Sequence, residues 1–286
     1  LWPARGAASA HAYYWRVVTH IADGPLPDEE HVDISRLQAY LRHSAGAQYE
    51  TVHAPGLTMF FHATDDMRYL NYAIPDADWG ASLEASLPAL RREFEARSRL
   101  PRFEFVEEYA PALTQTLAAN GYREEYRGPS MVCVPGTLVA ASEVAGLTIE
   151  RVDAHATEET LRELVCTQRQ GFGGPETSEP NEGDMAYLRT ALQTSCAFLA
   201  RLDAQAVGAG TLTPPHAGLS ELGGVATLEP YRRRGIATAV TAAAAAYAFE
   251  SGLEAVCLSA GDAGSTRVYE RAGFRVIATM LAYSLD

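Results

Sequence analysis

Lysine is absent from this chain of 286 residues, so all 23 basic residues are arginine, and 36 acidic residues outnumber them. The net charge of −13 leaves no positive excess of the kind that non-specific binding to nucleic acid or to an anionic membrane requires. A cationic partner fits this charge better. Because alanine is also abundant, we interpret the missing lysine as an effect of genome composition rather than of function.

Cysteine is scarce as well. Cys133, Cys166, Cys196 and Cys257 lie far apart and form no Cys-x-x-Cys pair, and no secretory signal is evident, so no disulfide framework is expected. We expect mostly buried, reduced thiols and a cytoplasmic location. The longest apolar stretch, residues 235–249, is dominated by alanine and is shorter than the ~20 residues that span a bilayer. The sequence therefore predicts no membrane crossing.

The histidines lack the spacing of a metal site. Six of the eight fall in the first 62 residues. They are His11, His20, His31, His43, His53 and His62. None forms a His-Glu-x-x-His pair, and no cysteine joins them at ligand spacing. We therefore expect no bound metal.

What the sequence does have is a glycine-containing turn between an apolar, strand-like segment (225–228) and an alanine-rich helix expected over 234–250. The turn and the start of the helix read Arg232, Arg233, Arg234, Gly235, Ile236, Ala237 and Thr238. Backbone N–H groups at a helix start have no partner within the helix, and the helix dipole adds positive charge there. Gly235 permits the turn and close approach of a ligand, and Thr238 adds a hydroxyl. The segment predicts a diphosphate-binding turn, although an ordinary solvated helix start has the same bare pattern.

A second motif follows downstream. Residues 262–271 predict a short capped helix that carries Tyr269 and ends at Gly273 and Phe274. A strand over 255–259 lies between the two motifs. The Arg-x-x-Gly-x-Ala turn and the helix closed by Gly-Phe, in this order, resemble motifs of the GNAT superfamily of N-acetyltransferases.

The resemblance covers about residues 146–286 and implies an α/β fold with a mixed sheet and acetyl-CoA as co-substrate. It implies that backbone groups of Val225, Ala226 and Thr227 bind the pantetheine arm and polarise the thioester carbonyl. Thr227 departs from the valine that is more usual at the end of this strand. The predicted cofactor-binding residues are Val225, Ala226, Thr227, Arg232, Arg233, Arg234, Gly235, Ile236, Ala237, Thr238 and Ser265.

Two residues are candidates for catalysis. Glu221 stands on the strand that leads into the turn, among non-polar neighbours whose burial would raise its pKa toward that of a useful base. Matching glutamates serve as bases in some members of the family, and a solvated carboxylate at a strand end is the alternative. Tyr269 matches the family tyrosine that protonates the departing thiolate, whereas simple packing of an amphipathic helix is its alternative.

The acceptor is less well defined by the sequence. Glu176, Glu179, Glu182 and Asp184 crowd a loop that lines the acceptor side in relatives, where they would attract an ammonium group, although a solvated loop explains them equally. We therefore expect N-acetyl transfer to a small, cationic amine by direct attack on the thioester. The alternative is a non-catalytic acyl-CoA-binding or sensing protein. Neither acyl-chain length nor oligomeric state follows from these residues.

The chain divides at a stretch of small residues, 135–145, which is typical of a linker. Residues 146–286 predict the order β, α, α, β, β, β, α, β, α, β, the complete catalytic domain. Residues 1–145 repeat its ending faintly, with a helix (82–99), a strand (103–106) and a helix (111–120) closed by Gly121 and Tyr122.

This first half lacks both chemical elements, because residues 76–80 replace the arginine turn and Leu117 stands opposite Tyr269. We expect two tandem GNAT-like domains, the first one degenerate, and residues 1–10 disordered. An unrelated α/β domain is the alternative for the first half.

Overall fold

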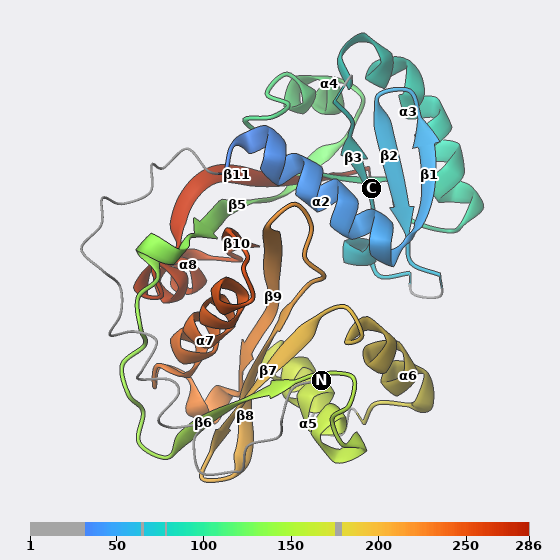
Figure 1. The fold of residues 1–286 in the computed structure, drawn as a ribbon. Coiled ribbons are helices and arrows are strands. Elements are labelled where there is room, and N and C mark those ends of the chain that lie inside the picture. Colours follow the sequence, from blue (N-terminus) through green and yellow to red (C-terminus); the bar gives the residue numbers. More distant parts are fainter. Residues whose placement is uncertain (1–31, 64–65, 78, 175–178, 286) are drawn as a thin grey trace.

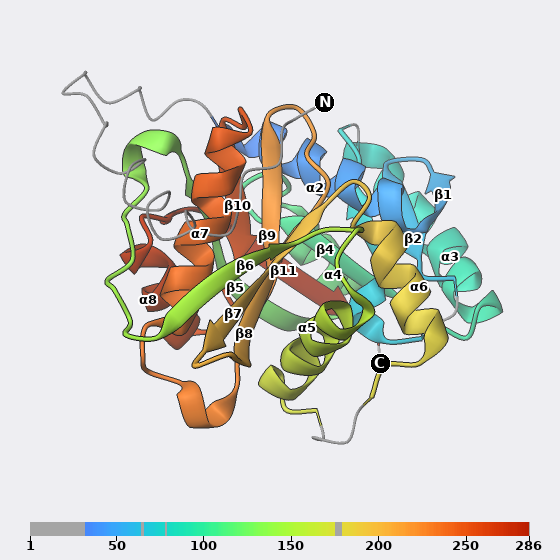
Figure 2. The same ribbon diagram turned by 60° about the horizontal axis from the view of Figure 1, so that its bottom comes forward.

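A computed structural model of the chain describes residues 32–63, 66–77, 79–174 and 179–285. The disorder expected for residues 1–10 lies outside the described residues, as do His11, His20 and His31. The described part forms one mixed sheet of 11 strands with helices on both faces (Figures 1 and 2). The strand order is β1-β2-β3-β4-β11-β5-β10-β9-β8-β7-β6.

The second half has the order of elements that the sequence predicts. Its elements are β6 (Leu147–Val152), α5 (Glu158–Gly171), α6 (Glu182–Ala191), β7 (Cys196–Leu202), β8 (Gln205–Leu212), β9 (Leu219–Thr227), η4 (Glu229–Tyr231), α7 (Ile236–Glu250), β10 (Ala255–Ser259), α8 (Ala263–Arg271) and β11 (Arg275–Ser284). Helix α7 begins two residues later than expected, because Arg233 and Gly235 adopt positive φ angles of 63° and 85°. Helix α6 begins at Glu182, where Asn181 and Asp184 form a capping box.

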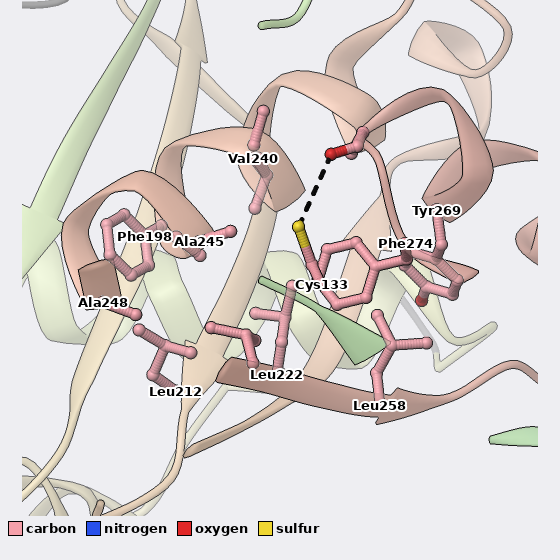
Figure 3. Close-up of a cluster of buried hydrophobic side chains, with 14 of the residues drawn as sticks. Cys133, Phe198, Leu212, Leu222, Val240, Ala245, Ala248, Leu258, Tyr269 and Phe274 are labelled. Atoms are coloured by element: carbon pink, nitrogen blue, oxygen red, sulfur yellow. Dashed lines mark hydrogen bonds between the residues drawn. The ribbon is translucent and has the colours of Figure 1, made fainter. Parts of the chain in front are cut away.

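Alternate residues of β7 pack on opposite faces of the sheet. Phe198 and Leu202 face α7, in the cluster that also contains Leu222, Leu258 and Phe274 (Figure 3). Ala197 and Leu199 face α5. The alanines of α7 let the helix lie close to the sheet, so this half has a buried layer on each side of its strands.

The first half contains more regular structure than its sequence indicates. Its elements are α2 (Ile34–Gln48), β1 (Glu50–Ala54), β2 (Leu57–Phe61), η2 (Arg68–Leu70), β3 (Asn71–Pro75), α3 (Trp79–Ala96), β4 (Arg102–Val106), α4 (Leu113–Ala119), β5 (Arg123–Cys133) and η3 (Pro135–Thr137). Helices α3 and α4 cover one face through Leu87 and Leu117, and α2 covers the other through Tyr40.

The last strand of each half pairs with strands of the other half. Strand β5 of the first half lies between β11 and β10 of the second half and pairs antiparallel with both. Strand β11 of the second half pairs in turn with β4 of the first half. The two halves therefore share a continuous sheet, and Figure 1 shows β5 and β11 side by side at their junction.

Helix α2 ties the first half to the second over this junction. The Tyr40 hydroxyl lies 2.5 Å from Thr213 Oγ1 and accepts a hydrogen bond of 2.9 Å from the backbone N–H of Glu221. Arg36 forms an ion pair of 2.6 Å with Glu254. Through Tyr40 the first half therefore directly contacts β9, the strand that carries the predicted base Glu221.

The structure also bears on the expectations about the cysteines and about membrane crossing. Cys133, Cys196 and Cys257 are buried and Cys166 is half-buried, and none of these four described cysteines forms a disulfide. Among the residues that the structure describes, no helix is both long and apolar enough to cross a bilayer.

Candidate functional site

The predicted phosphate turn lies in a groove of about 850 Å³ between the end of β9 and the first turns of α7 and α8. Every predicted cofactor-binding residue except Arg234 lines this groove. The groove has the volume of a small-molecule site. The sequence motif and the fold therefore bring together strand backbone, turn and helix starts in one place.

The turn presents unpaired backbone donors to this groove. Helix α7 begins at Gly235 without a side-chain cap, whereas Asp262 caps α8 and Thr157 caps α5. The first N–H groups of α7 are therefore available to a ligand, and Ile236, Ala237 and Thr238 all line the groove. Left-handed residues in the turn add to this concave arrangement of N–H groups.

The three consecutive arginines have different positions. Arg232 donates hydrogen bonds to the carbonyl oxygens of Thr227, at 3.1 Å, and Gly171, at 2.8 Å, so it joins β9 to the end of α5. Arg234 lies over the ring of Tyr231, 5.8 Å from its centroid. Arg233 lines the groove and makes no ion pair within the described part of the chain. Of the three, Arg233 is the guanidinium best placed for a phosphate.

The groove is also lined by two arginines to which the sequence analysis assigned no role. Arg267 and Arg271 stand four residues apart on α8, so they share one face of that helix. In the sequence, the spacing of four residues indicates only that the two arginines share a helix face. That this face lines the groove follows only from the position of α8 beside the turn. Ser265 also lines the groove, and its hydroxyl is engaged with the capping residue Asp262.

Strand β9 separates from β10 at the point where the reaction is expected. Parallel pairing between the two strands covers Leu219, Ser220 and Glu221 and then stops. On the other side, the pairing with β8 shifts register between Ala209 and Thr211, opposite residues 223–226 of β9. Gly224 takes a φ of 60°, so this shift is a β-bulge built on glycine. The backbone after Glu221 therefore has an unpaired edge toward the groove.

Glu221 itself lines a second cavity, of about 300 Å³, two residues before the bulge. The described residues make no hydrogen bond or ion pair with its carboxylate. Burial raises the pKa of Glu221 from 4.5 to about 7, and the neighbouring charge of Glu104 adds to the rise. A carboxyl with this pKa is poised to exchange a proton at neutral pH.

Tyr269 lies on α8 between the groove-lining residues Val268 and Arg271. Its side chain is 8% exposed, and its ring centroid lies 6.2 Å from that of Phe274 (Figure 3). Burial raises the pKa of Tyr269 to about 12, and the charge of Asp262 acts in the same direction. The phenol therefore retains its proton at neutral pH. Its proposed role as an acid stays a prediction.

Three of the four acidic residues that were expected to attract the acceptor, Glu179, Glu182 and Asp184, lie within the described residues. Glu176 falls outside the described residues. Glu179 forms an ion pair with Arg162 at 3.5 Å, and Asp184 with Arg169 at 2.8 Å. Glu179, Glu182 and Asp184 line neither the groove nor the second cavity. The carboxylates that line the second cavity are those of Glu221 and Glu104, and Glu104 was not a candidate from sequence.

Comparisons with known proteins agree with this geometry. Residues 159–274 match the model of the acetyltransferase (GNAT) family. The chain is similar to the structure of a GCN5-related N-acetyltransferase from Kribbella flavida, with 26% identity and a TM-score of 0.72 over 88% of this chain and 95% of that one. A comparison with curated proteins returns no match.

Two further solved structures share the fold. One is a GCN5-related N-acetyltransferase from Sphaerobacter thermophilus, with 18% identity and a TM-score of 0.60 over 80% of this chain and 76% of that one. The other is a tandem GNAT protein from the clavulanic acid biosynthesis pathway, with 14% identity and a TM-score of 0.56 over 80% of this chain and 77% of that one. Residues 159–274 therefore carry the match to the acetyltransferase (GNAT) family, and acyl transfer from acetyl-CoA is the general activity of that family.

Proposed function

We propose that this chain is an N-acetyltransferase that transfers the acetyl group of acetyl-CoA to the amine of a small acceptor. One observation carries the proposal. The groove and the cavity that contains Glu221 lie next to each other along β9, with Gly223 lining the cavity and Val225 lining the groove. Two residues of chain span at most about 7 Å, and the bulge at Gly224 shortens this span. A thioester bound at the bulge would therefore be within reach of an amine beside Glu221.

The residues divide the chemistry as follows. Glu221 takes one proton from the ammonium form of the acceptor, so that a neutral amine attacks the thioester carbonyl carbon. The C–N bond forms, the C–S bond breaks, and backbone N–H groups of β9 stabilise the charge on the carbonyl oxygen. The Tyr269 hydroxyl protonates the leaving thiolate and is reprotonated as the new amide loses its second proton. One proton leaves Glu221 to solvent in each cycle.

The groove residues fit coenzyme A. Uncapped N–H groups of α7 and the guanidinium of Arg233 would hold the pyrophosphate, and Arg267 and Arg271 would meet further phosphate charge. Thr227 and its neighbours would pair with the pantetheine amides through the unpaired edge of β9.

We also propose that the two halves are tandem GNAT-like units, residues 1–145 and 146–286. Each half contains the order strand, helix, strand, helix, strand, as β3-α3-β4-α4-β5 and as β9-α7-β10-α8-β11. In each, the first two of these strands pair in parallel, and the last strand crosses to the other half. The first unit would be catalytically degenerate, because Leu117 replaces the tyrosine.

Release of free thiol from acetyl-CoA, measured over a panel of small amines, tests the activity, and calorimetry with coenzyme A tests the groove. Turnover of at least one amine together with binding of coenzyme A supports the enzyme. Binding without turnover across the panel favours an acyl-CoA sensor, and absence of binding removes the assignment of the groove.

A further inference from the structure

The cavity beside Glu221 is built by both halves of the chain. Helix α2 and strands β3, β4 and β5 of the first half contribute one side, and β9 and β11 contribute the other. Glu104 lines it from β4 and Tyr126 from β5. The acceptor side of the site therefore depends on residues that lie outside the region of the family match, 159–274.

The walls of this cavity carry negative charge and aromatic rings. Among the residues that the structure describes, its lining includes the carboxylates of Glu104 and Glu221 and no arginine or histidine. Glu104 accepts a hydrogen bond from Arg102, whose guanidinium also donates to Glu125 at 3.0 Å. Arg102 is 2% exposed and does not line the cavity, so it orients Glu104 from behind.

Three tyrosines, Tyr49, Tyr72 and Tyr126, line the same space together with aliphatic side chains such as Leu41 and Ile74. Carboxylates combined with aromatic rings attract cations, and aliphatic walls favour an apolar body. A second anionic group on the ligand would meet two like charges without any basic partner. The cavity of about 300 Å³ has space for only about ten water molecules at ~30 Å³ each, which limits the ligand to a small molecule.

We propose that the acceptor is a small primary amine with an apolar or aromatic body and no carboxylate, bound as an ammonium ion between Glu221 and Glu104. This inference rests on the proposed function and narrows it. Glu104, although it belongs to the first half, is then the residue that selects an uncharged or cationic body over an amino acid. Tyr126 borders the same pocket and is held in place by the hydrogen bond of 2.6 Å that its hydroxyl donates to the carbonyl of Ala260.

Glu104 is the charged neighbour that acts on Glu221, because the other titratable groups around Glu221 are neutral. Burial raises the pKa of Tyr40, of Tyr72 and of the Cys257 thiol above their ordinary values, so all three are neutral at neutral pH. The charge of Glu104 raises the pKa of Glu221, after the larger effect of burial. Replacing Glu104 by glutamine removes that charge and leaves Arg102 without this partner. Both changes ease the ionisation of Glu221.

The experiment compares pairs of acceptors that differ only by the α-carboxylate, such as an aromatic ethylamine and the amino acid of the same side chain. They are tested as substrates by thiol release and as ligands by calorimetry without acetyl-CoA. The parent protein is expected to prefer the amine by a factor of about 100 or more in kcat/KM, because two carboxylates oppose the acid.

Glu104→Gln is expected to raise KM for the amine about tenfold with little change in KM for acetyl-CoA. The rise of kcat/KM with pH is expected to begin at lower pH in this variant, an effect that a purely structural defect would not produce. Glu84→Gln is the matched control, because it removes one negative charge from an exposed position of α3 in the same half. It should behave as the parent.

Equal use of the amine and the amino acid by the parent overturns the inference. So does a Glu104→Gln variant whose KM and pH profile equal those of Glu84→Gln. These outcomes differ from failure of the proposed function, in which coenzyme A does not bind or no amine is acetylated. The amine and amino acid titrations use the parent protein, so they test the cavity even if a variant fails to fold or turnover is not found.

Discussion

Replacing Glu221 by glutamine is the most direct test of the reaction proposed for this chain. The substitution keeps the size of the side chain and removes its capacity to accept a proton. Loss of a positioned general base reduces turnover by about 10²- to 10⁴-fold. The residual rate of Glu221→Gln should rise as the pH approaches the pKa of the amine, because solvent then supplies neutral acceptor.

The pH dependence of the parent follows from the pKa of Glu221, raised to about 7 by burial and by Glu104. The base is active only when ionised, so kcat/KM should increase about tenfold between pH 6 and pH 8. An ordinary glutamate, with a pKa of ~4.3, would give a flat profile over this interval.

The same pKa has a consequence for stability. The folded state holds the Glu221 proton between pH 4.5 and about pH 7, where the unfolded chain has lost it, so this contribution to stability is lost as the pH rises. At about 1.36 kcal/mol per pH unit, the burial of this charge costs about 3 kcal/mol at pH 8. Glu221→Gln should therefore gain up to about 3 kcal/mol in unfolding free energy relative to the parent between pH 5 and pH 8.

The assays are thiol release over pH 5.5–9 and denaturant unfolding at pH 5 and pH 8. Glu250→Gln is the control, because Glu250 is exposed at the end of α7 and carries the same charge. A parent profile that is flat between pH 6 and pH 8, together with unchanged turnover in Glu221→Gln, would refute the reasoning.

Three further predictions concern the groove and the core. Tyr269→Phe should lower kcat about tenfold or more while calorimetry shows unchanged binding of coenzyme A, and an unchanged kcat would assign Tyr269 to packing alone. Gly235→Ala and Gly252→Ala should each cost about 1 kcal/mol in denaturant unfolding, because φ is 85° and 87° at these positions, but only Gly235→Ala should weaken coenzyme A binding. Phe274→Ala should cost about 3–5 kcal/mol by the same measurement, because this ring is 2% exposed in the core, and a loss below 1 kcal/mol would contradict that packing.

The second half was largely predictable because its signals are local. An apolar run set the bounds of β10 to the residue, and Gly235, Asp262 and Gly273 marked helix ends that the structure confirms within one or two positions. The groove followed because adjacent residues in one turn form most of it.

The first half was less predictable for physical reasons. Strand β5 begins with the charged residues 123–125 and contains Gly128 and Pro129, and both features weaken a strand prediction. Its central position arises only in the folded sheet, where it pairs with β11 and β10. Nothing local pairs Glu104 with Glu221, which are brought together by the register between distant strands. The acceptor cavity therefore had no signature in the sequence.

The crossing of β5 and β11 has a consequence for how the molecule is made on the ribosome. Strand β11 is translated after every other described element, yet it has to insert between β4 and β5, which emerge more than 100 residues earlier. Until it arrives, the nascent amino-terminal portion exposes open strand edges, and contacts of such long sequence separation form slowly. The two portions should therefore complete folding as one cooperative event rather than in succession, and neither should be stable when expressed separately.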